Sequence, residues 1–258
     1  MAIPVTLPRL SWGDPHAERR ALLLHGLGSD AALMWRYGVA LADDGWRADA
    51  VDLRGHGSAP RALDCTLEAY AADVAALRTD GEPWDLVIAH SLGGAAAVLA
   101  SAAHPRWTRR LMLIDPAVHL SDEDRENVRQ GQEESFADPS VDAIRATHPD
   151  WHELDIELKA AATRAASRWM VEQTSAQNTT WDVRDAASRL SVPTHVIGAD
   201  PAVFSIFTGA TAAEVLQNPR ITMSVVAGAG HSPHRDLPDA TIQMVRSALV
   251  GAPKEALS

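Results

Sequence analysis

Residues 85–94 read DLVIAHSLGG, and this stretch decides the fold. An apolar run that ends at Ala89 is followed within two residues by Ser91 and then by an alanine-rich stretch of good helix formers. A strand, a sharp turn and a helix in this order are the context that a nucleophilic serine requires, and small residues at Ala89 and Gly93 leave room for the backbone to bend. Serine is also a preferred helix N-cap, so the stretch alone leaves open that Ser91 only caps the helix.

Short apolar runs recur on both sides of this stretch. The runs that we predict as strands are residues 21–24, 47–51, 85–89, 111–114, 194–197 and 222–226. Good helix formers at helical spacing occupy residues 67–77 and 94–103, and an amphipathic stretch at 239–249 predicts a closing helix. Strands that alternate with helices predict an α/β fold with a mostly parallel, doubly wound sheet.

One region breaks this alternation. Residues 121–189 form a long polar stretch with helical patterning, acidic at its start, between the fourth and fifth predicted strands. We interpret it as a helical cap inserted into a core made of residues 1–120 and 190–258. Such a cap would lie over the carboxyl ends of the strands, where ligands bind in open α/β sheets. The alternative is that these helices are ordinary outer helices of the sheet.

Two further motifs follow predicted strands. His25-Gly26-Leu27-Gly28 ends the first strand, and Gly230-His231-Ser232-Pro233 comes after the last one. Together with the Ser91 turn, these motifs resemble the α/β-hydrolase family, in its serine hydrolase and esterase branch. The resemblance implies that Ser91 is the nucleophile and that the amides of Leu27 and Leu92 form the oxyanion hole, which stabilises the negative oxygen of a tetrahedral intermediate.

Several histidines are candidates for the general base. In the resembled family the base lies in the loop between the last strand and the closing helix, which points to His231. His234 is its competitor, but it lies three residues further into a proline-containing loop. His56, in a glycine-rich turn after the second strand, and His90, beside the nucleophile, are interpreted as structural.

Two aspartates are candidates for the acid that orients the base. A histidine base needs a buried carboxylate to hold its tautomer and to stabilise the imidazolium ion. Asp200 follows the next-to-last strand, which is the usual position of the acid in the resembled family. Asp115 follows the strand after the nucleophile, where some lipases of the family carry it. We prefer Asp200 slightly and keep Asp115 open.

Composition narrows the choice of partners. The 258 residues carry 23 Lys and Arg against 34 Asp and Glu, a net charge of −11, so the surface is expected to repel nucleic acid and anionic lipid. No apolar run approaches the roughly 18 residues of a membrane span. The N-terminal residues show no secretion signal, so we expect a cytoplasmic protein, and the lone Cys65 rules out an internal disulfide.

The predicted function is hydrolysis of a small-molecule ester or lactone through an acyl-enzyme on Ser91, with no metal or organic cofactor. Trp151, Trp169 and Met170 in the predicted cap suggest contacts with an apolar or aromatic substrate. Three other functions stay open: hydrolysis of a carbon–carbon bond, cofactor-free oxygenase or perhydrolase chemistry, and a non-catalytic small-molecule receptor. The sequence indicates no oligomeric state.

Overall fold

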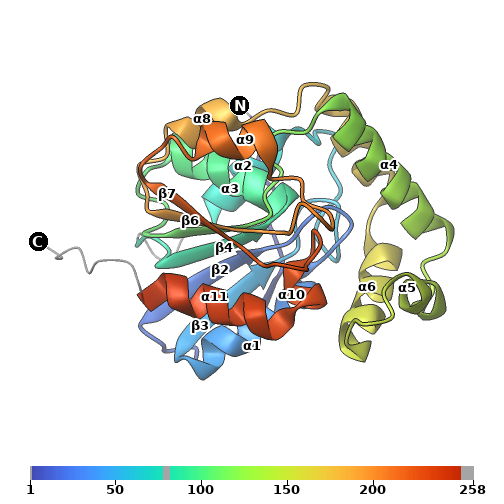
Figure 1. Ribbon diagram of the computed structural model, residues 1–258, viewed down its shortest axis with the longest axis horizontal. Coiled ribbons are helices and arrows are strands. Elements are labelled where there is room, and N and C mark those ends of the chain that lie inside the picture. The colour runs from blue at the N-terminus through green and yellow to red at the C-terminus, as the bar shows by residue number, and fades with distance from the viewer. Residues whose placement is uncertain (1, 78–81, 251–258) are drawn as a thin grey trace, which may run out of the picture.

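A seven-stranded sheet forms the centre of the computed structural model, which describes residues 2–77 and 82–250 (Figure 1). The strands are β1 (Arg9–Trp12), β2 (Arg19–Leu24), β3 (Trp46–Val51), β4 (Leu86–His90), β5 (Leu111–Ile114), β6 (Thr194–Gly198) and β7 (Ile221–Val225). Their order is β1-β3-β2-β4-β5-β6-β7, and every neighbouring pair is parallel except β1 with β3. The predicted mostly parallel sheet is therefore confirmed, with all six predicted strands in place, and β1 is an antiparallel edge strand that the sequence did not reveal.

Helices cover both faces of the sheet (Figure 1). On one face lie α1 (Trp35–Asp43) and α11 (Pro238–Val250), and on the other lie α2 (Leu67–Ala76), α3 (Leu92–Ala103), α8 (Arg184–Ser188) and α9 (Gly209–Val215). Two short helices, η1 (Ala31–Met34) and α10 (Pro233–Asp236), lie in loops that follow strands. Within the described residues, no helix is long and apolar enough to cross a bilayer.

The central strands are apolar on both faces because each face is covered. Successive side chains of a strand point to opposite sides of the sheet. Leu22 and Leu24 of β2 accordingly join the larger core cluster, with side chains of α2 and α3, whereas Ala21 and Leu23 join the second cluster, with side chains of α1 and α11. This double burial explains why β2 reads as a continuous apolar run.

A helical insert follows β5. It consists of α4 (Asp122–Ala137), α5 (Val141–Thr147), α6 (Glu153–Ala165) and α7 (Arg168–Gln177), and α4, α5 and α6 stand together beside the sheet in Figure 1. The sequence predicted an insert over residues 121–189. Its last part lies instead on the core, since Trp181 is buried in the larger core cluster and α8 packs against α3.

Candidate active site

The turn between β4 and α3 holds Ser91 in a strained backbone conformation. Its φ is 51°, and among the described residues other than glycine only Asp115 shares a positive φ. Such strain in a non-glycine residue clusters at functional sites. Gly93 allows this tight turn, because a Cβ there would lie only 2.6 Å from the carbonyl oxygen of His25. Ser91 makes no side-chain cap on α3, so its hydroxyl is free for another partner.

That partner is His231, which bridges Ser91 and a buried carboxylate. The Nε2 atom of His231 lies 3.0 Å from Oγ of Ser91, and its Nδ1 atom lies 2.7 Å from Oδ2 of Asp115. The three side chains come from the loops after β4, β5 and β7, which all open at the carboxyl end of the sheet. This serine, histidine and aspartate chain has the connectivity that acyl transfer requires.

The Asp115 carboxylate is fully buried and held by several donors. Besides His231, it accepts hydrogen bonds from the Ser205 hydroxyl at 2.6 Å and from the Ile206 amide at 3.1 Å. Burial alone would raise the pKa of this carboxyl, but the bond and charge of His231, followed by the donors at Ser205 and Ile206, hold its pKa below the usual value. Asp115 is therefore an anion that can fix the His231 ring.

Asp200 lies elsewhere, and this corrects the preference drawn from the sequence. Its Oδ2 accepts the amide of Gly228 at 2.7 Å and its Oδ1 accepts the amide of Ala202 at 2.8 Å. Both acceptor oxygens are thus used by backbone, and these amide bonds lower the pKa of the Asp200 carboxyl. The side chain supports the loop that leads to His231 but does not reach the ring.

Two buried histidines fix the loop that carries Leu27. His25 Nδ1 bonds the carbonyl of Gly26 at 2.7 Å, and His56 Nε2 accepts the amide of Gly28 at 3.1 Å. Burial lowers the pKa of His25 to about 3 and that of His56 to about 4, so both rings are neutral near pH 7. Because the N–H and C=O of a trans peptide point in opposite directions, the bond to Gly26 turns the Leu27 N–H away from His25.

Leu92 offers the second amide that the sequence predicted. It is the first residue of α3, and the first N–H groups of a helix have no acceptor inside the helix. The partial positive charge of a helix N-terminus also favours a negative oxygen at this point. Leu27 and Ser91 both line the cavity described below, and Leu92 directly follows Ser91 in the chain.

Two other histidines lie close to His231. The sequence analysis interpreted His90 as structural and His234 as the competitor of His231. His90 Nε2 bonds the carbonyl of His231 at 2.8 Å, and His234 stands 5.1 Å from the His90 ring. Burial lowers the pKa of both rings well below the usual value, aided by the charges of His231 and Arg235. Neither ring contacts Ser91 Oγ through a hydrogen bond within the described chain, so His231 is the histidine that reaches the serine hydroxyl there.

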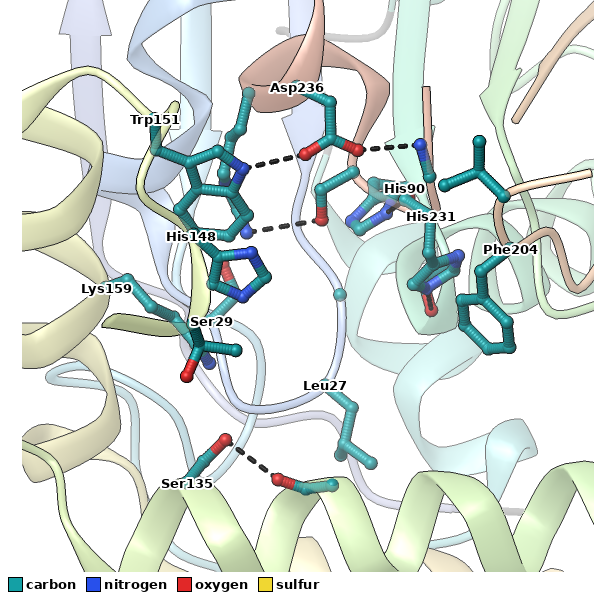
Figure 2. A pocket seen from close by; sticks show the side chains of 18 of the residues that line it. Leu27, Ser29, His90, Ser135, His148, Trp151, Lys159, Phe204, His231 and Asp236 are labelled. Atoms are coloured by element: carbon teal, nitrogen blue, oxygen red, sulfur yellow. Dashed lines mark hydrogen bonds between the residues drawn. The ribbon is translucent and has the colours of Figure 1, made fainter. Parts of the chain in front are cut away.

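A cavity of about 790 Å³ opens in front of Ser91 and His231. Loops of the core form one wall and the insert forms the other. Figure 2 shows His231 and Phe204 on one side and His148, Trp151 and Lys159 opposite them. The apolar side chains that line the cavity are Leu27, Val128, Pro149, Trp151, Val203, Phe204 and Leu237.

Only one of the three predicted substrate contacts lines this cavity. Trp151 does, and its position is fixed by a 2.7 Å bond from its indole nitrogen to Asp236 and by stacking on His148 at 3.8 Å. Trp169 is 46% exposed on α7 and does not line the cavity. Met170 is fully buried, and its sulfur lies 3.2 Å from the Ala62 amide. The structure therefore removes Trp169 and Met170 from the candidate contacts.

Several site residues escaped the sequence analysis. Ser205 and Phe204 lie in a loop with no motif, and nothing in the sequence marks them. Lys159 offered one weak signal, since lysine is rare in this chain and otherwise occurs only at Lys254. In the part of the chain that the structure describes, no group of three or more His, Cys, Asp or Glu side chains could hold a metal ion.

Known sequences match this chain over most of its core. A family model described as the alpha/beta hydrolase family matches residues 21–244. A lipase of Mycobacterium tuberculosis, LipV, is 34% identical over 156 residues, which cover 60% of this chain and 53% of that protein. A pimeloyl-[acyl-carrier protein] methyl ester esterase of Neisseria meningitidis is 38% identical over 111 residues, 43% of this chain and 34% of that enzyme. The aligned part thus spans about a third to a half of these curated relatives.

Solved structures share the whole fold. The E-2-(acetamidomethylene)succinate hydrolase superposes with a TM-score of 0.82 and 22% identity, covering 96% of both chains. An esterase of Exiguobacterium antarcticum reaches 0.79 at 16% identity, covering 97% of this chain and 100% of its own. An enol-lactonase of Burkholderia xenovorans superposes with a TM-score of 0.76 and 21% identity, covering 95% of this chain and 96% of its own. At these identities the likeness shows the fold alone.

Proposed function

Because this chain belongs to the α/β-hydrolase family, we propose that it hydrolyses small-molecule carboxylic esters or lactones through an acyl-enzyme on Ser91. One observation carries the proposal: His231 lies within hydrogen-bond distance of both Ser91 Oγ and Asp115 Oδ2. A neutral imidazole in this position can accept the serine proton while the carboxylate holds the other ring nitrogen.

Acylation begins when His231 Nε2 takes the proton of Ser91. The serine oxygen forms a bond to the carbonyl carbon of the substrate, and the carbonyl oxygen takes the electron pair and becomes an oxyanion. The amides of Leu27 and Leu92 stabilise this oxyanion in our proposal. The bond to the alcohol then breaks, and the leaving alkoxide receives the proton from His231.

Asp115 supports both proton transfers without being protonated itself. Its hydrogen bond to Nδ1 keeps the ring in the tautomer whose Nε2 is a proton acceptor. Its negative charge also stabilises the imidazolium that forms after the first transfer. The low pKa of Asp115, set by its donors against the effect of burial, keeps this charge in place at neutral pH.

Deacylation repeats the same steps with water as the nucleophile. Water gives its proton to His231 and adds to the acyl carbon, and the oxyanion again faces the two amides. Breakdown of this intermediate releases the acid and returns the proton to Ser91. The histidine thus acts as base and then as acid in each half of the reaction.

The cavity supports a small substrate with an apolar portion. Phe204 and Leu237 are 45% and 38% exposed and line the cavity beside the histidine loop, where an acyl or alkyl chain could cover them. The activities named for the relatives, a lipase, a methyl ester esterase and an enol-lactonase, all break an acyl–oxygen bond, which agrees with this proposal.

The proposal is tested with p-nitrophenyl acetate and butyrate. We expect hydrolysis that Ser91→Ala lowers by at least about 10⁴-fold, since removing the nucleophile of a triad has effects of this size or larger. Ser188→Ala, an exposed serine on α8, is the control and should leave the rate unchanged. A fluorophosphonate should label wild-type Ser91 and not the alanine variant.

Two outcomes would overturn the proposal. A wild-type protein that neither turns over these esters nor reacts with the fluorophosphonate would be better explained as a receptor on the hydrolase scaffold. Oxygen uptake that survives Ser91→Ala would instead point to the cofactor-free oxygenase chemistry that this fold also supports.

A further inference from the structure

Two positively charged side chains line the active-site cavity without a carboxylate partner. Lys159 comes from α6 in the insert, and Arg235 comes from α10 in the histidine loop. Among the residues that the structure describes, neither forms a salt bridge, and their hydrogen bonds reach only a carbonyl and a hydroxyl. Buried charges are normally paired, because an unpaired one forfeits its solvation by water.

Lys159 uses one of its donors. Its ammonium nitrogen lies 2.8 Å from the carbonyl oxygen of Gly28. An ammonium group has three N–H donors, so two remain for a ligand in the cavity. Figure 2 shows the Lys159 and Ser29 side chains on the wall opposite His231.

The Arg235 side chain makes a weaker hydrogen bond to the protein than Lys159 does. The residue is 5% exposed, and its Nη1 atom lies 3.4 Å from the Ser232 hydroxyl, a long contact. Its Nε atom is buried without a partner in the described structure. The guanidinium lies 5.2 Å from the centre of the Trp151 ring, so the aromatic face supports the cation on one side.

The acids near these cations are already engaged by other donors. Asp155 accepts two bonds from Arg36 and one from the Trp35 indole. Asp236 accepts the Trp151 indole on one oxygen and the Gly230 amide on the other. These carboxylates lower the cost of burying the Arg235 cation, but among the described residues neither accepts a hydrogen bond from Lys159 or Arg235.

Ser29 adds an unpartnered hydroxyl to the same wall. It follows Gly28, whose carbonyl binds Lys159, and it lines the cavity. The residue is 4% exposed, and its Oγ is buried with no hydrogen-bond partner in the described chain. A buried hydroxyl without a protein partner costs stability, so Ser29 can offer its hydrogen bond to a ligand in the cavity.

We propose that Lys159, Arg235 and Ser29, here called the cationic wall, bind an ionised carboxylate of the substrate. The preferred substrates would then be esters or lactones that carry a free acid in addition to the bond cleaved at Ser91. This inference rests on the proposed hydrolase function. A carboxylate supplies acceptor oxygens for both cations, which have no acid partner in the described chain, and for the unpartnered Ser29 hydroxyl. On a chain with net charge −11, such a wall would also offset the general repulsion of an anionic substrate.

The test compares esters that differ only by an acid group. The first pair is p-nitrophenyl hydrogen glutarate and p-nitrophenyl pentanoate, with the acid on the acyl side. The second is 4-carboxyphenyl butyrate and phenyl butyrate, with the acid on the alcohol side. We expect wild-type kcat/KM to favour the acid in at least one pair, and Lys159→Gln to lower that preference by about ten- to a hundredfold, the effect of one charged hydrogen bond.

Two further variants separate binding from structure. Lys159→Arg keeps the charge and should restore much of the preference, because a role limited to packing would not depend on charge. Arg164→Gln removes a cation from the exposed side of the same helix and should leave the preference unchanged. Fluorophosphonate labelling of each variant shows that Ser91 still reacts.

The outcomes distinguish this inference from the proposed function. Hydrolysis of the neutral esters without any preference for the acids would overturn the cationic wall and leave the hydrolase intact. A preference that Lys159→Gln does not change would also overturn it. Glutarate should inhibit more strongly than inorganic phosphate at equal concentration, and the reverse order would show that the wall selects phosphate rather than carboxylate. Failure of every ester and of the fluorophosphonate would overturn the hydrolase proposal itself.

The pH profile gives an independent readout. Burial, aided by the charge of Arg235 and opposed by Asp30, lowers the pKa of Lys159 to about 8. Burial, aided by the charge of Lys159, lowers the pKa of the nearby His56 and His148 rings, so neither ring adds a positive charge beside Lys159 over this pH range. The acid preference should therefore fall as the pH rises from 7 to 9, and a flat ratio would contradict the role of Lys159.

Discussion

Two Asp-Pro pairs end neighbouring strands of the sheet, and they differ sharply in what their carboxylates do. Asp115 follows β5 and Asp200 follows β6, so both stand at the edge where a triad acid is expected. The Asp115 side chain is fully buried and binds His231, whereas Asp200 is half-buried and accepts the backbone amides of Ala202 and Gly228. The position of an aspartate at a strand end therefore does not show whether it orients the histidine. The hydrogen-bond donors that surround the carboxylate decide its role.

The loop that carries Asp200 still contributes to the site. Ser205 and the amide of Ile206 lie in this loop, and both donate to the carboxylate of Asp115. Asp200 itself binds the amide of Gly228, three residues before His231. The loop after β6 thus supplies donors to the acid and support to the histidine loop instead of the acid itself.

The substitution Asp115→Asn should have the largest effect on this comparison. An amide in place of the carboxylate presents an N–H donor or a neutral oxygen to Nδ1, and it removes the charge that stabilises the imidazolium. We expect kcat for p-nitrophenyl butyrate to fall by about 10⁴-fold, on the precedent of the equivalent change in another triad enzyme. If Asp115→Asn kept most of its activity, the assignment of the acid would be wrong.

Ser205→Ala should have the next largest effect. The change deletes a 2.6 Å hydrogen bond to Oδ1 of Asp115, so it raises the pKa of this carboxyl and loosens its orientation. Other donors to Asp115 remain, and we expect kcat to fall by about tenfold, the value of one hydrogen bond to a charged group. Ser224→Ala is the matched control, since its hydroxyl binds His195 away from the cavity. Equal effects of the two variants would show that Ser205 is not a positioning residue.

Asp200→Asn should have a smaller effect than either. The asparagine keeps one oxygen for an amide donor, so only one of the two loop bonds is lost. We expect kcat/KM to fall by less than about tenfold, because the His231 loop becomes less fixed while the triad contacts remain. A loss of several orders of magnitude here, with an active Asp115→Asn variant, would restore Asp200 as the acid.

Local patterns made the fold and the nucleophile predictable from the sequence. The apolar run before Ser91 is a central strand because both of its faces are covered, and the small residue Gly93 marks a turn where a Cβ would collide with the His25 carbonyl. His231 follows the last strand in a glycine-rich loop, which is also a local signal. The short strand β1 carried no comparable signal, because it is an edge strand with mostly exposed side chains.

The acid and the substrate contacts could not be predicted, because tertiary packing decides them. Asp115 and Asp200 are both followed by proline at strand ends, and only the arrangement of Ser205 and His231 in space distinguishes them. Trp169 is of a residue type that often contacts ligands, but it lies on an exposed part of α7. Helical spacing in the insert indicates helices, but it does not show which side of each helix meets the cavity.

The smallest expected effect is a difference between the Asp115→Asn and Asp200→Asn variants in their stability at acidic pH. The pKa of each carboxyl is lowered in the folded protein, in Asp115 despite its burial and in Asp200 by two amide bonds. A carboxyl with a lowered folded pKa stabilises the protein fully above about pH 5, and this contribution is lost as the pH falls through the folded pKa. The difference in free energy of unfolding between wild type and Asp115→Asn should therefore shrink as the pH falls from 5 to 3, measured by urea denaturation.

The matching difference for Asp200→Asn should be smaller at pH 5, because its amide partners are near solvent whereas the donors to Asp115 are buried and would be left unpaired. Equal differences at pH 5 would mean that the buried donors around Asp115 stabilise it no more than the two amides stabilise Asp200.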